Sequence, residues 1–588
     1  MTRDRMAHRL DQIAFALLVT LAASLAFEWI EPLLSAGGVL AFTNVELLLL
    51  TALAAWLLSR VAGGRWPAVP ATMARPAGLW LLVLLASALL APAHRVDALK
   101  FTARTASGLL AGWAAYDLVV RSPHATPRRT WLLQAMALGG ALVAALGLAE
   151  YAQLRPAVDW LAGFKHGQTV VGEVLRVSAS LGYATVAAMI LELTAPLLLV
   201  WAVTARRRWL KLLLALGLLA TLAALVLTLS RGGVIALTAS LLLMALLAWR
   251  LGFRALAGSG LAATAGLLAL VGLLFVVNPV TLLRLTSESA AEWYRATYIA
   301  PESLEAVQGE ALTVPIQVTN AGVRTWEPAG DRPFMLSYHV LRPDGTLVAF
   351  DGVRTPLPQA VAPGESVPLD GRLRVPVQPG DYVVAWEMLQ EGVAWFADRG
   401  AEPATMRLEV LAGTAGGTVP APDTAGGARL AWRPPPVGRL QLWSMALSMV
   451  RARPLLGVGP DNYRLAYGVY ADTGTWDTRV HANNLYLEWL ADTGILGFLV
   501  FIWLNAAILL VACRNLALGN PQGIHPAYAK WQVALLGSLA AWYVHGLFDS
   551  FYEFTPTLLA FWLLAGLAVT GQDSEHYRRL QKPHAARL

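Results

Sequence analysis

Residues 479–497, which read RVHANNLYLEWLADTGILG, join a polar segment to an apolar run at 498–513. His481, Asn483 and Asn484 therefore lie where the backbone passes from water into lipid. Side chains that donate, accept or orient protons are costly at that boundary unless they have partners or a function. A histidine with its ordinary pKa of about 6.5 can accept a proton near neutral pH. The alternative is that an asparagine only caps the following helix, a position that Asn favours; capping and chemistry are compatible.

Three arginines lie beside apolar or amphipathic segments, and Arg176 is the weakest candidate among them. Arg231 lies in the short turn 229–233 between two apolar runs, Arg439 opens a segment with an amphipathic helical stripe, and Arg176 precedes another apolar run. A planar guanidinium can hold two phosphate oxygens in a fork, which a lysine cannot do. The alternatives are that Arg231 reaches toward lipid headgroups and that Arg439 is a solvated helix residue.

Other polar residues are weaker candidates. Lys165 and His166 precede the same apolar run as Arg176. Asp549 and Glu553 lie near a short turn between two apolar runs and are equally well explained as interfacial charges. If the proton acceptor lies elsewhere, His166 or the carboxylate of Glu488 is the alternative.

The composition indicates a membrane protein. Of 588 residues, 56% are hydrophobic and 14% charged, and the mean hydropathy of +0.53 is too high for a soluble globular protein. The single cysteine, Cys513, excludes an intrachain disulfide. No cleavable signal peptide is evident, because the run at 13–34 is long enough to span and lacks a clear cleavage site. The net charge of +7 matters less than where Lys and Arg lie, and we expect no nucleic-acid partner.

Twelve apolar stretches approach the roughly 20 residues that a membrane span needs. The stretch at 97–119 is the weakest, because Lys100 and Arg104 lie near its start. The candidate spans lie near residues 12–34, 43–60, 77–93, 97–119, 130–151, 183–203, 209–229, 232–249, 256–277, 485–513, 529–550 and 555–571.

The basic residues indicate how the chain crosses the membrane. If the chain zigzags through twelve spans, nearly all Lys and Arg residues at span ends fall on one side, together with both termini. Cytoplasmic loops are enriched in Lys and Arg, so that side is predicted to be the cytoplasm. The segments predicted to lie outside are 152–182, 229–233, 278–484 and 551–554.

The long outer segment is predicted to contain a domain of short strands. Apolar and polar residues alternate at 312–318, 334–340, 373–377, 382–388 and 406–410, with turn-forming residues between them. This spacing predicts an immunoglobulin-like β-sandwich, whose simplest role is positioning or binding. The predicted organisation is 1–284, membrane domain with spans 1–9; 302–411, extracytoplasmic sandwich; 412–435, flexible linker; 436–484, extracytoplasmic amphipathic helix and catalytic loop; and 485–575, spans 10–12.

The stretch around Asn484 resembles the signature of the O-antigen ligase and polymerase family. In that family a loop after a long external segment carries His, then Asn, nine residues, Gly, two residues and a small residue; here Asn484, Gly494 and Gly497 fit. The family usually has its catalytic His directly before the Asn, where this chain has Asn483. His481 matches the first His of a His-x-His-Asn variant of the motif.

Further elements are similar to the same family. They are the Ser-Arg-Gly turn at Arg231, the pattern Arg-x-x-x-Trp followed by Pro-Leu-Leu-Gly-x-Gly within 439–459, and, less distinctively, the segment around Arg176. The resemblance is most specific at 176–250 and 436–500, and the sandwich lies outside it.

The resemblance implies a GT-C-like, polytopic α-helical membrane glycosyltransferase of the bacterial inner membrane. Its donor would be a glycan linked to a polyprenyl diphosphate such as undecaprenyl diphosphate, and transfer to an acceptor hydroxyl would occur on the external face. Acceptors within the family differ: lipid A core in ligases, another glycan repeat in polymerases, and a protein hydroxyl in oligosaccharyltransferases. The expected partners are the donor, one of these acceptors and membrane lipids.

The resemblance also suggests roles for individual residues. Arg231 and Arg439 would bind the diphosphate and His481 would be the base, so these are the predicted catalytic residues. Arginines can stabilise a departing diphosphate without a metal, and no Asp-x-Asp motif or His/Cys cluster of ligand spacing occurs in the outer segments, so we expect no metal and no cofactor. The predicted substrate-binding residues are Arg176, Asn483, Asn484, Arg479 and Tyr486.

A transporter or flippase with an accessory sandwich is the alternative from another class of protein. It requires ionisable residues near the bilayer midplane and broken helices. Glu192 and His545 come nearest to this requirement, whereas the other polar candidates gather in the outer segments.

Overall fold

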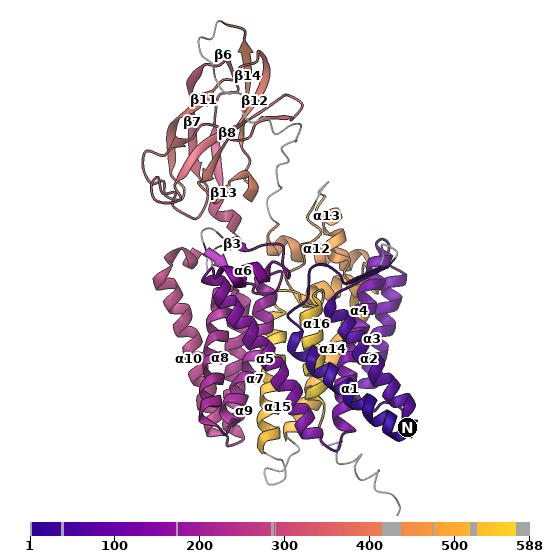
Figure 1. Cartoon of the computed structure of the whole chain (residues 1–588). Helices are drawn as coiled ribbons and strands as arrows, with labels where there is room; N and C mark the ends of the chain where they lie inside the picture. Colours follow the sequence, from indigo (N-terminus) through magenta and orange to yellow (C-terminus); the bar gives the residue numbers. More distant parts are fainter. Residues whose placement is uncertain are drawn as a thin grey trace, which may run out of the picture. The chain divides into compact units, whose positions relative to one another are not determined.

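The computed structural model describes residues 3–36, 40–171, 174–283, 287, 290–413, 437–472, 476–517 and 526–571. The chain divides into two compact units, which are described separately: a helical unit of residues 1–170, 175–277 and 439–588, and a second unit of residues 171–174 and 278–438. Figure 1 shows the helices of the first unit and the strands of the second. The predicted linker 412–435 lies almost wholly outside the described residues, as do the basic residues after 571.

The helical unit follows the predicted apolar stretches. Every predicted span overlaps a helix, although the first helix begins at Arg3 and ends at Ser24, well before residue 34. The helices are α1 Arg3–Ser24, α2 Asn44–Ala62, α3 Ala71–Leu89, α4 Arg95–Val120, α5 Ala125–Tyr151, α6 Arg155–Leu161, α7 Ala184–Thr204, α8 Arg208–Leu227, α9 Arg231–Arg250, α10 Arg254–Val277, α12 Arg439–Ala452, α13 Tyr463–Tyr470, α14 Leu485–Ala517, α15 Pro526–His545 and α16 Thr555–Ala568. The short strands are β1 Leu34–Ala36, β2 Leu40–Phe42, β3 Thr169–Val171 and β4 Val174–Arg176.

Within the described residues, nine helices are long and apolar enough to cross a membrane: α1, α2, α3, α5, α7, α8, α9, α10 and α14. Helix α16 is apolar but shorter, and α4 contains Lys100 and Arg104. The helical unit is therefore that of a polytopic membrane protein. The count of twelve spans and the GT-C-like arrangement stay predictions.

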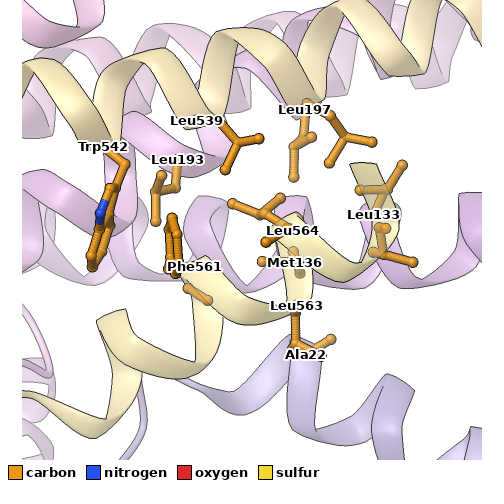
Figure 2. Close-up of a cluster of buried hydrophobic side chains, with 14 of the residues drawn as sticks. Ala22, Leu133, Met136, Leu193, Leu197, Leu539, Trp542, Phe561, Leu563 and Leu564 are labelled. Carbon is orange, nitrogen blue, oxygen red and sulfur yellow. The ribbon is translucent and has the colours of Figure 1, made fainter. Parts of the chain in front are cut away.

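The helices pack through large apolar side chains and through small residues. Figure 2 shows Leu193, Leu539, Trp542 and Phe561, from α7, α15 and α16, in one buried cluster. The rings of Trp542 and Phe561 stack with centroids 4.7 Å apart. Where α4 meets α16, a Cβ on Gly566 would lie 2.8 Å from the carbonyl carbon of Gly112, so these two backbones touch directly. Glycine at such a contact lets membrane helices approach closely.

The second unit contains two sheets around one core. One sheet has the order β10-β8-β12-β14-β6, with β9 beside β8 and β13 beside β12; the other has the order β11-β7-β5. The neighbouring strands are antiparallel except for β14 and β6. The strands are β5 Ala296–Ile299, β6 Ser303–Val307, β7 Ala311–Asn320, β8 Phe334–Leu341, β9 Leu347–Ala349, β10 Thr355–Pro356, β11 Ser366–Arg374, β12 Gly380–Gln390, β13 Ala394–Trp395 and β14 Ala404–Leu411.

Inward-facing residues of both sheets form the core, as alternation predicts. Val314, Ile316 and Val318 of β7 are buried with Val384 and Trp386 of β12. This sheet-rich region is compatible with an inserted domain. One predicted strand is misplaced: the alternation at 373–377 predicted a strand there, but β11 runs from Ser366 to Arg374 and overlaps only the first two of those residues. The immunoglobulin-like class and the boundaries 302–411 stay predictions.

Candidate active site

Asn484 caps helix α14. Its Oδ1 accepts hydrogen bonds from the backbone N–H groups of Tyr486 (3.1 Å) and Leu487 (3.0 Å), and its Nδ2 donates to the carbonyl of Leu547 (3.1 Å). Asn483, directly before it, has a φ of 49°, in the left-handed region that Asn tolerates better than most residues. The capping alternative is thus what the Asn484 side chain does here, and the cap also ties the start of α14 to the turn after α15.

Helix α14 is broken at Gly494, which differs from the single continuous span predicted for 485–513. Gly494 has φ 65° and ψ −172°, a conformation that only glycine adopts readily. The amide groups beyond the break bond instead to another segment: Ile495 N–H donates to the carbonyl of Pro454 (2.8 Å), and Leu496 N–H to that of Leu455 (3.2 Å). The Gly of the signature therefore marks a backbone docking site.

The segment that docks at this break is the Pro-Leu-Leu-Gly-x-Gly pattern. Val458 N–H donates to the carbonyl of Ala491 (3.0 Å), and Gly459 N–H donates to that of Asp492 (2.9 Å). Gly457 has a φ of 67°, and a Cβ there would overlap the backbone of Ala491 and Asp492. The Pro-Leu-Leu-Gly-x-Gly pattern and the stretch around Gly494 are thus joined by backbone hydrogen bonds in both directions.

The loop that carries His481 is also fixed by α12. Trp443 Nε1 donates a hydrogen bond of 3.0 Å to the carbonyl of Ala482. Trp443 lies one helical turn after Arg439, at the start of α12. The hydrogen bond of Trp443 therefore fixes the position of the His481 loop relative to the end of α12 that carries Arg439. The Trp of the Arg-x-x-x-Trp pattern therefore holds the His481 loop in place.

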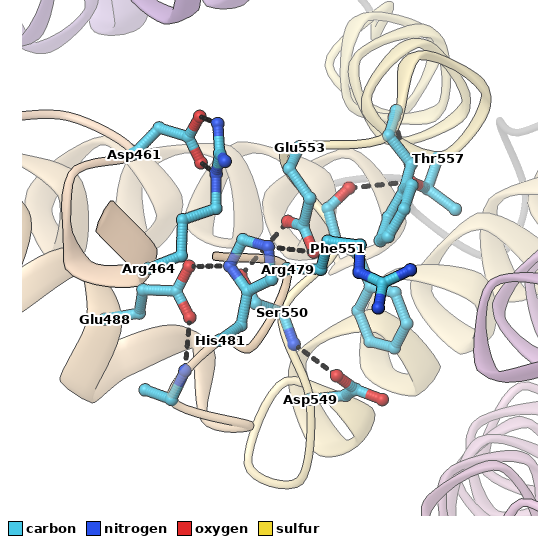
Figure 3. A network of polar contacts seen from close by, with 12 residues as sticks. Asp461, Arg464, Arg479, His481, Glu488, Asp549, Ser550, Phe551, Glu553 and Thr557 are labelled. Carbon is cyan, nitrogen blue, oxygen red and sulfur yellow. Dashed lines mark hydrogen bonds and ion pairs between the residues drawn. The ribbon is translucent and has the colours of Figure 1, made fainter. Parts of the chain in front are cut away.

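His481 lies between two glutamates (Figure 3). Its Nδ1 is 2.6 Å from Oε1 of Glu488, and its Nε2 is 3.7 Å from Oε1 of Glu553. The other carboxylate oxygen of Glu488 accepts a hydrogen bond of 3.0 Å from the backbone N–H of Ala482. Glu488 is on the first turn of α14, and Glu553 is on the turn before α16. All three side chains are largely buried.

The two carboxylates change the protonation of His481. Burial disfavours the imidazolium, but the charges of Glu488 and Glu553 outweigh it and raise the pKa of His481 to about 10. The pKa of about 6.5 assumed from the sequence therefore does not hold, and His481 is a cation at neutral pH. Burial raises the pKa of Glu553 to about 7, with the charge of His481 opposing the rise and that of Glu488 adding to it.

Arg176 and Arg439 lie near Asp549, in the turn after α15, and Arg231 lies near Arg176. Burial raises the pKa of Asp549, and the positive charges of His545, Arg439 and His481 oppose that rise. Burial lowers the pKa of Arg176, while the charge of Asp549 raises it and that of Arg231 lowers it further. Arg176 also donates from Nε to the carbonyl of Thr228 at 2.9 Å.

The structure therefore brings Arg176, Arg439 and His481 within electrostatic range of one carboxylate, and Arg231 within range of Arg176. They come from four separate stretches of sequence. Such an arrangement can bind an anion carrying more than one negative charge.

Three other candidates have different surroundings. Arg479 is 76% exposed and forms an ion pair of 2.8 Å with Asp477. The hydroxyl of Tyr486 donates to the carbonyl of Tyr543 at 2.8 Å. Lys165 is buried in an ion pair with Glu150. These contacts are structural, and a substrate-binding role for Arg479 and Tyr486 stays a prediction.

Glu192 and His545, the residues suggested by the transporter alternative, are bonded to each other. Nδ1 of His545 is 2.9 Å from Oε1 of Glu192, and its Nε2 is 3.4 Å from the hydroxyl of Ser230. The same hydroxyl accepts a hydrogen bond of 3.1 Å from the N–H of Gly233 and so caps α9 directly before Arg231. The pair is fully buried and supports the turn that carries Arg231.

His481, Glu488 and Glu553 also offer three ligand atoms within 4.8 Å of one another, as a metal site would. Ligand atoms around a tetrahedral ion with bonds of about 2.0–2.2 Å lie about 3.4 Å apart. The 2.6 Å between Nδ1 and Glu488 Oε1 fits a hydrogen bond instead. We interpret the group as hydrogen-bonded, and the expectation that no metal is needed stays a prediction.

The sequence assigned no catalytic role to Glu553 or Asp549. Both were equally well explained as interfacial charges, and Glu488 was only an alternative base. One feature of the sequence could have singled them out. Glu488, Asp549 and Glu553 all lie in predicted outer turns or at the start of a span, near other predicted site residues. Glu488 is seven residues after His481, whereas Asp549 and Glu553 approach His481 only through the packing of α14, α15 and α16.

The fold and these polar groups define a polytopic α-helical membrane protein with an acidic–basic site built from the segments between its helices. Residues 423–502 match the family model described as O-Antigen ligase. The family assignment predicted from the Asn–Gly–Gly frame is thereby confirmed, and the family suggests activity as a membrane glycosyltransferase of ligase or polymerase type. It also supports a bacterial membrane protein that acts in a lipid-linked glycan context.

The other comparisons add no argument. No curated protein matches the chain. Among solved structures, Pseudomonas fluorescens alkylpurine DNA glycosylase AlkC bound to DNA containing an abasic site analog matches with 9% identity, over 57% of this chain and 97% of that one. The TM-score of this match is 0.13.

Proposed function

We propose that the protein transfers a glycan from a polyprenyl diphosphate carrier to an acceptor hydroxyl on the extracytoplasmic face of the bacterial inner membrane. The observation that carries this proposal is the convergence of Arg176, Arg439 and His481 around Asp549, with Arg231 beside Arg176. Each was a candidate from its own sequence context, and random span-end arginines would not collect at one carboxylate.

The chemistry requires two things of the protein. The acceptor oxygen forms a bond to the anomeric carbon while the bond from that carbon to the diphosphate oxygen breaks, so negative charge develops on the departing diphosphate. Arg231 and Arg439 are proposed to stabilise this charge, with Arg176 as a further ligand. The acceptor hydroxyl must also lose its proton to a nearby base.

The proposed setting follows from the positive charges at the span ends. Both termini lie in the cytoplasm, and the site and the sandwich lie outside. The sandwich is proposed to position or bind an acceptor or glycan. The acceptor class is lipid, glycan or protein, and the ligase-like reaction with a lipid acceptor is our first proposal because residues 423–502 match the ligase model.

The test uses the full-length protein in lipid nanodiscs with a polyprenyl-diphosphate-linked glycan. Release of polyprenyl diphosphate is measured with lipid A core, free glycan repeats or an acceptor protein in separate reactions. We expect release with one of these acceptors. No release with any acceptor, from protein that binds the donor, would exclude the proposed transfer, and movement of intact donor across the bilayer would support the transporter alternative.

A further inference from the structure

We propose that Glu553 is the base that removes the proton from the acceptor hydroxyl, and that His481 acts beside it as a fixed cation. This inference rests on the proposed glycosyl transfer and replaces the sequence-based assignment of His481 as the base. It assigns a catalytic role to a residue that the sequence explained equally well as an interfacial charge.

The hydrogen bonds around His481 occupy Glu488 more fully than Glu553, although the Glu553 carboxylate also accepts a hydrogen bond from its own backbone N–H. Glu488 has both oxygens engaged, one by Nδ1 of His481 at 2.6 Å and the other by the N–H of Ala482 at 3.0 Å. Oε1 of Glu553 instead faces Nε2 of His481 across 3.7 Å, which is longer than a hydrogen bond. The second oxygen of Glu553 is 3.3 Å from the hydroxyl of Ser550.

The 3.7 Å between Nε2 of His481 and Oε1 of Glu553 is too short for an oxygen to lie on the line between them, but an acceptor oxygen can contact both atoms from one side. An oxygen about 2.8 Å from each atom forms normal hydrogen bonds with both, and two such bonds are compatible with the 3.7 Å separation of the protein atoms. In that position Nε2–H of His481 donates to the acceptor oxygen, and the acceptor O–H donates to Glu553. The hydroxyl is thus oriented by one group and deprotonated by the other.

The step balances without a co-reactant. The acceptor oxygen bonds to the anomeric carbon, the bond from that carbon to the diphosphate oxygen breaks with its electron pair going to the diphosphate, and the acceptor proton passes to Glu553. The leaving diphosphate stays with the arginines around Asp549. His481 keeps its proton throughout and offsets the charge near the reacting oxygen.

Other nearby groups are less suited to the role. Asp461 is bound by both ends of the Arg464 guanidinium, at 3.0 and 2.8 Å. Asn483 carries a carboxamide, which is essentially non-basic. The charged groups that act on Glu553 are His481 from the loop, Glu488 from α14 and Asp461 from the segment before α13. Burial, which has the largest effect, and these charges together leave Glu553 with a pKa of about 7, where a base works well at neutral pH.

The pH dependence of the wild-type rate separates the two bases. If Glu553 accepts the proton, single-turnover transfer rises with pH through about 7 and then levels, because the carboxylate is fully ionised above its pKa. If neutral His481 accepted it, the rate would continue to rise toward a pH of about 10. A profile that rises to about 10 would overturn the inference.

Substitutions give the second measurement. Glu553→Gln keeps the shape of the side chain but cannot accept the proton, so kcat should fall about 10²–10⁴-fold with donor binding retained. Glu553→Asp keeps the carboxylate. It should therefore be faster than Glu553→Gln, and its rate should still rise with pH near 7. Glu31→Gln changes an exposed carboxylate that follows α1 and should be fully active.

The outcomes distinguish the inference from the function. If the wild-type protein binds donor but transfers no glycan, the proposed function is wrong and the inference with it. If the wild-type protein is active and Glu553→Gln keeps its rate and its pH profile, only the inference is wrong. Should Glu553→Gln not bind donor, the wild-type pH profile and the Glu553→Asp variant decide.

Discussion

Replacing Gly494 by alanine tests the contact between the two glycine-containing patterns of the family. At φ 65° and ψ −172° an alanine is strained, which costs about 1–3 kcal/mol. Its Cβ would lie 2.5 Å from the carbonyl oxygen of Leu455 and 2.6 Å from the nitrogen of Leu456. Both are backbone atoms that cannot rotate away, so the segment must move.

Movement of that segment breaks two hydrogen bonds. They join Ile495 to Pro454 and Leu496 to Leu455, and each contributes about 1 kcal/mol. The expected loss of stability is therefore about 3–5 kcal/mol, with strain included. Because the segment leads to Asp461 beside the His481 cluster, transfer activity should fall as well.

The assay is the apparent melting temperature of the protein in nanodiscs, measured at one scan rate. Gly272→Ala on α10 is the matched control, since nothing lies within 4 Å of a Cβ there, and alanine in a helix is favoured by about 1 kcal/mol. The control should be as stable as the wild-type protein. A Gly494→Ala variant with the melting temperature and activity of the control would refute the role given to this break.

Three further predictions follow from the site and the topology. Arg231→Lys should lower the transfer rate about 10²–10³-fold, because lysine cannot reproduce the fork, whereas Arg250→Lys at the other end of α9 should have no effect; equal rates would make Arg231 a headgroup contact. A reporter active only in the cytoplasm should be active after Leu588 and silent when inserted near Gly416, and the reverse result would contradict the proposed outer site. Treatment with EDTA should leave the rate unchanged, while a loss of activity that Mg²⁺ or Zn²⁺ restores would show that the His481 cluster holds an ion.

The sequence predicted the long helices, and its alternating stretches overlap the five longest strands of the second unit, because these apolar patterns are local. The period of two at 312–318 places Val314, Ile316 and Val318 in the core of the sandwich unit. The interruption of α14 was not predictable in the same way. Ile495 and Leu496 continue the apolar run, and only the carbonyl groups of a distant segment make the break at Gly494 favourable.

The candidate site was predicted in part for a similar reason. Arginine in an outer turn is unusual enough to single out Arg231, but a carboxylate such as Glu553 at a span end is ordinary. The sequence also suggested an ordinary pKa for His481. Of the two glutamates that raise it, Glu488 is seven residues away and Glu553 comes from the turn before α16, so the resting charge of the histidine depends in part on tertiary packing.

The position of Glu553 also has a consequence for biosynthesis. The ribosome delivers the arginines first, then the His481 loop, and Glu553 only between α15 and α16, the last helices of the helical unit. Leu485 N–H bonds to the carbonyl groups of Gly546 (2.8 Å) and Asp549 (3.1 Å), so the start of α14 is itself completed by this late turn. If Glu553 is the base, as proposed, a nascent chain that has not yet inserted α15 and α16 lacks both that base and the support of its histidine, and the order of synthesis would then prevent premature transfer during membrane insertion.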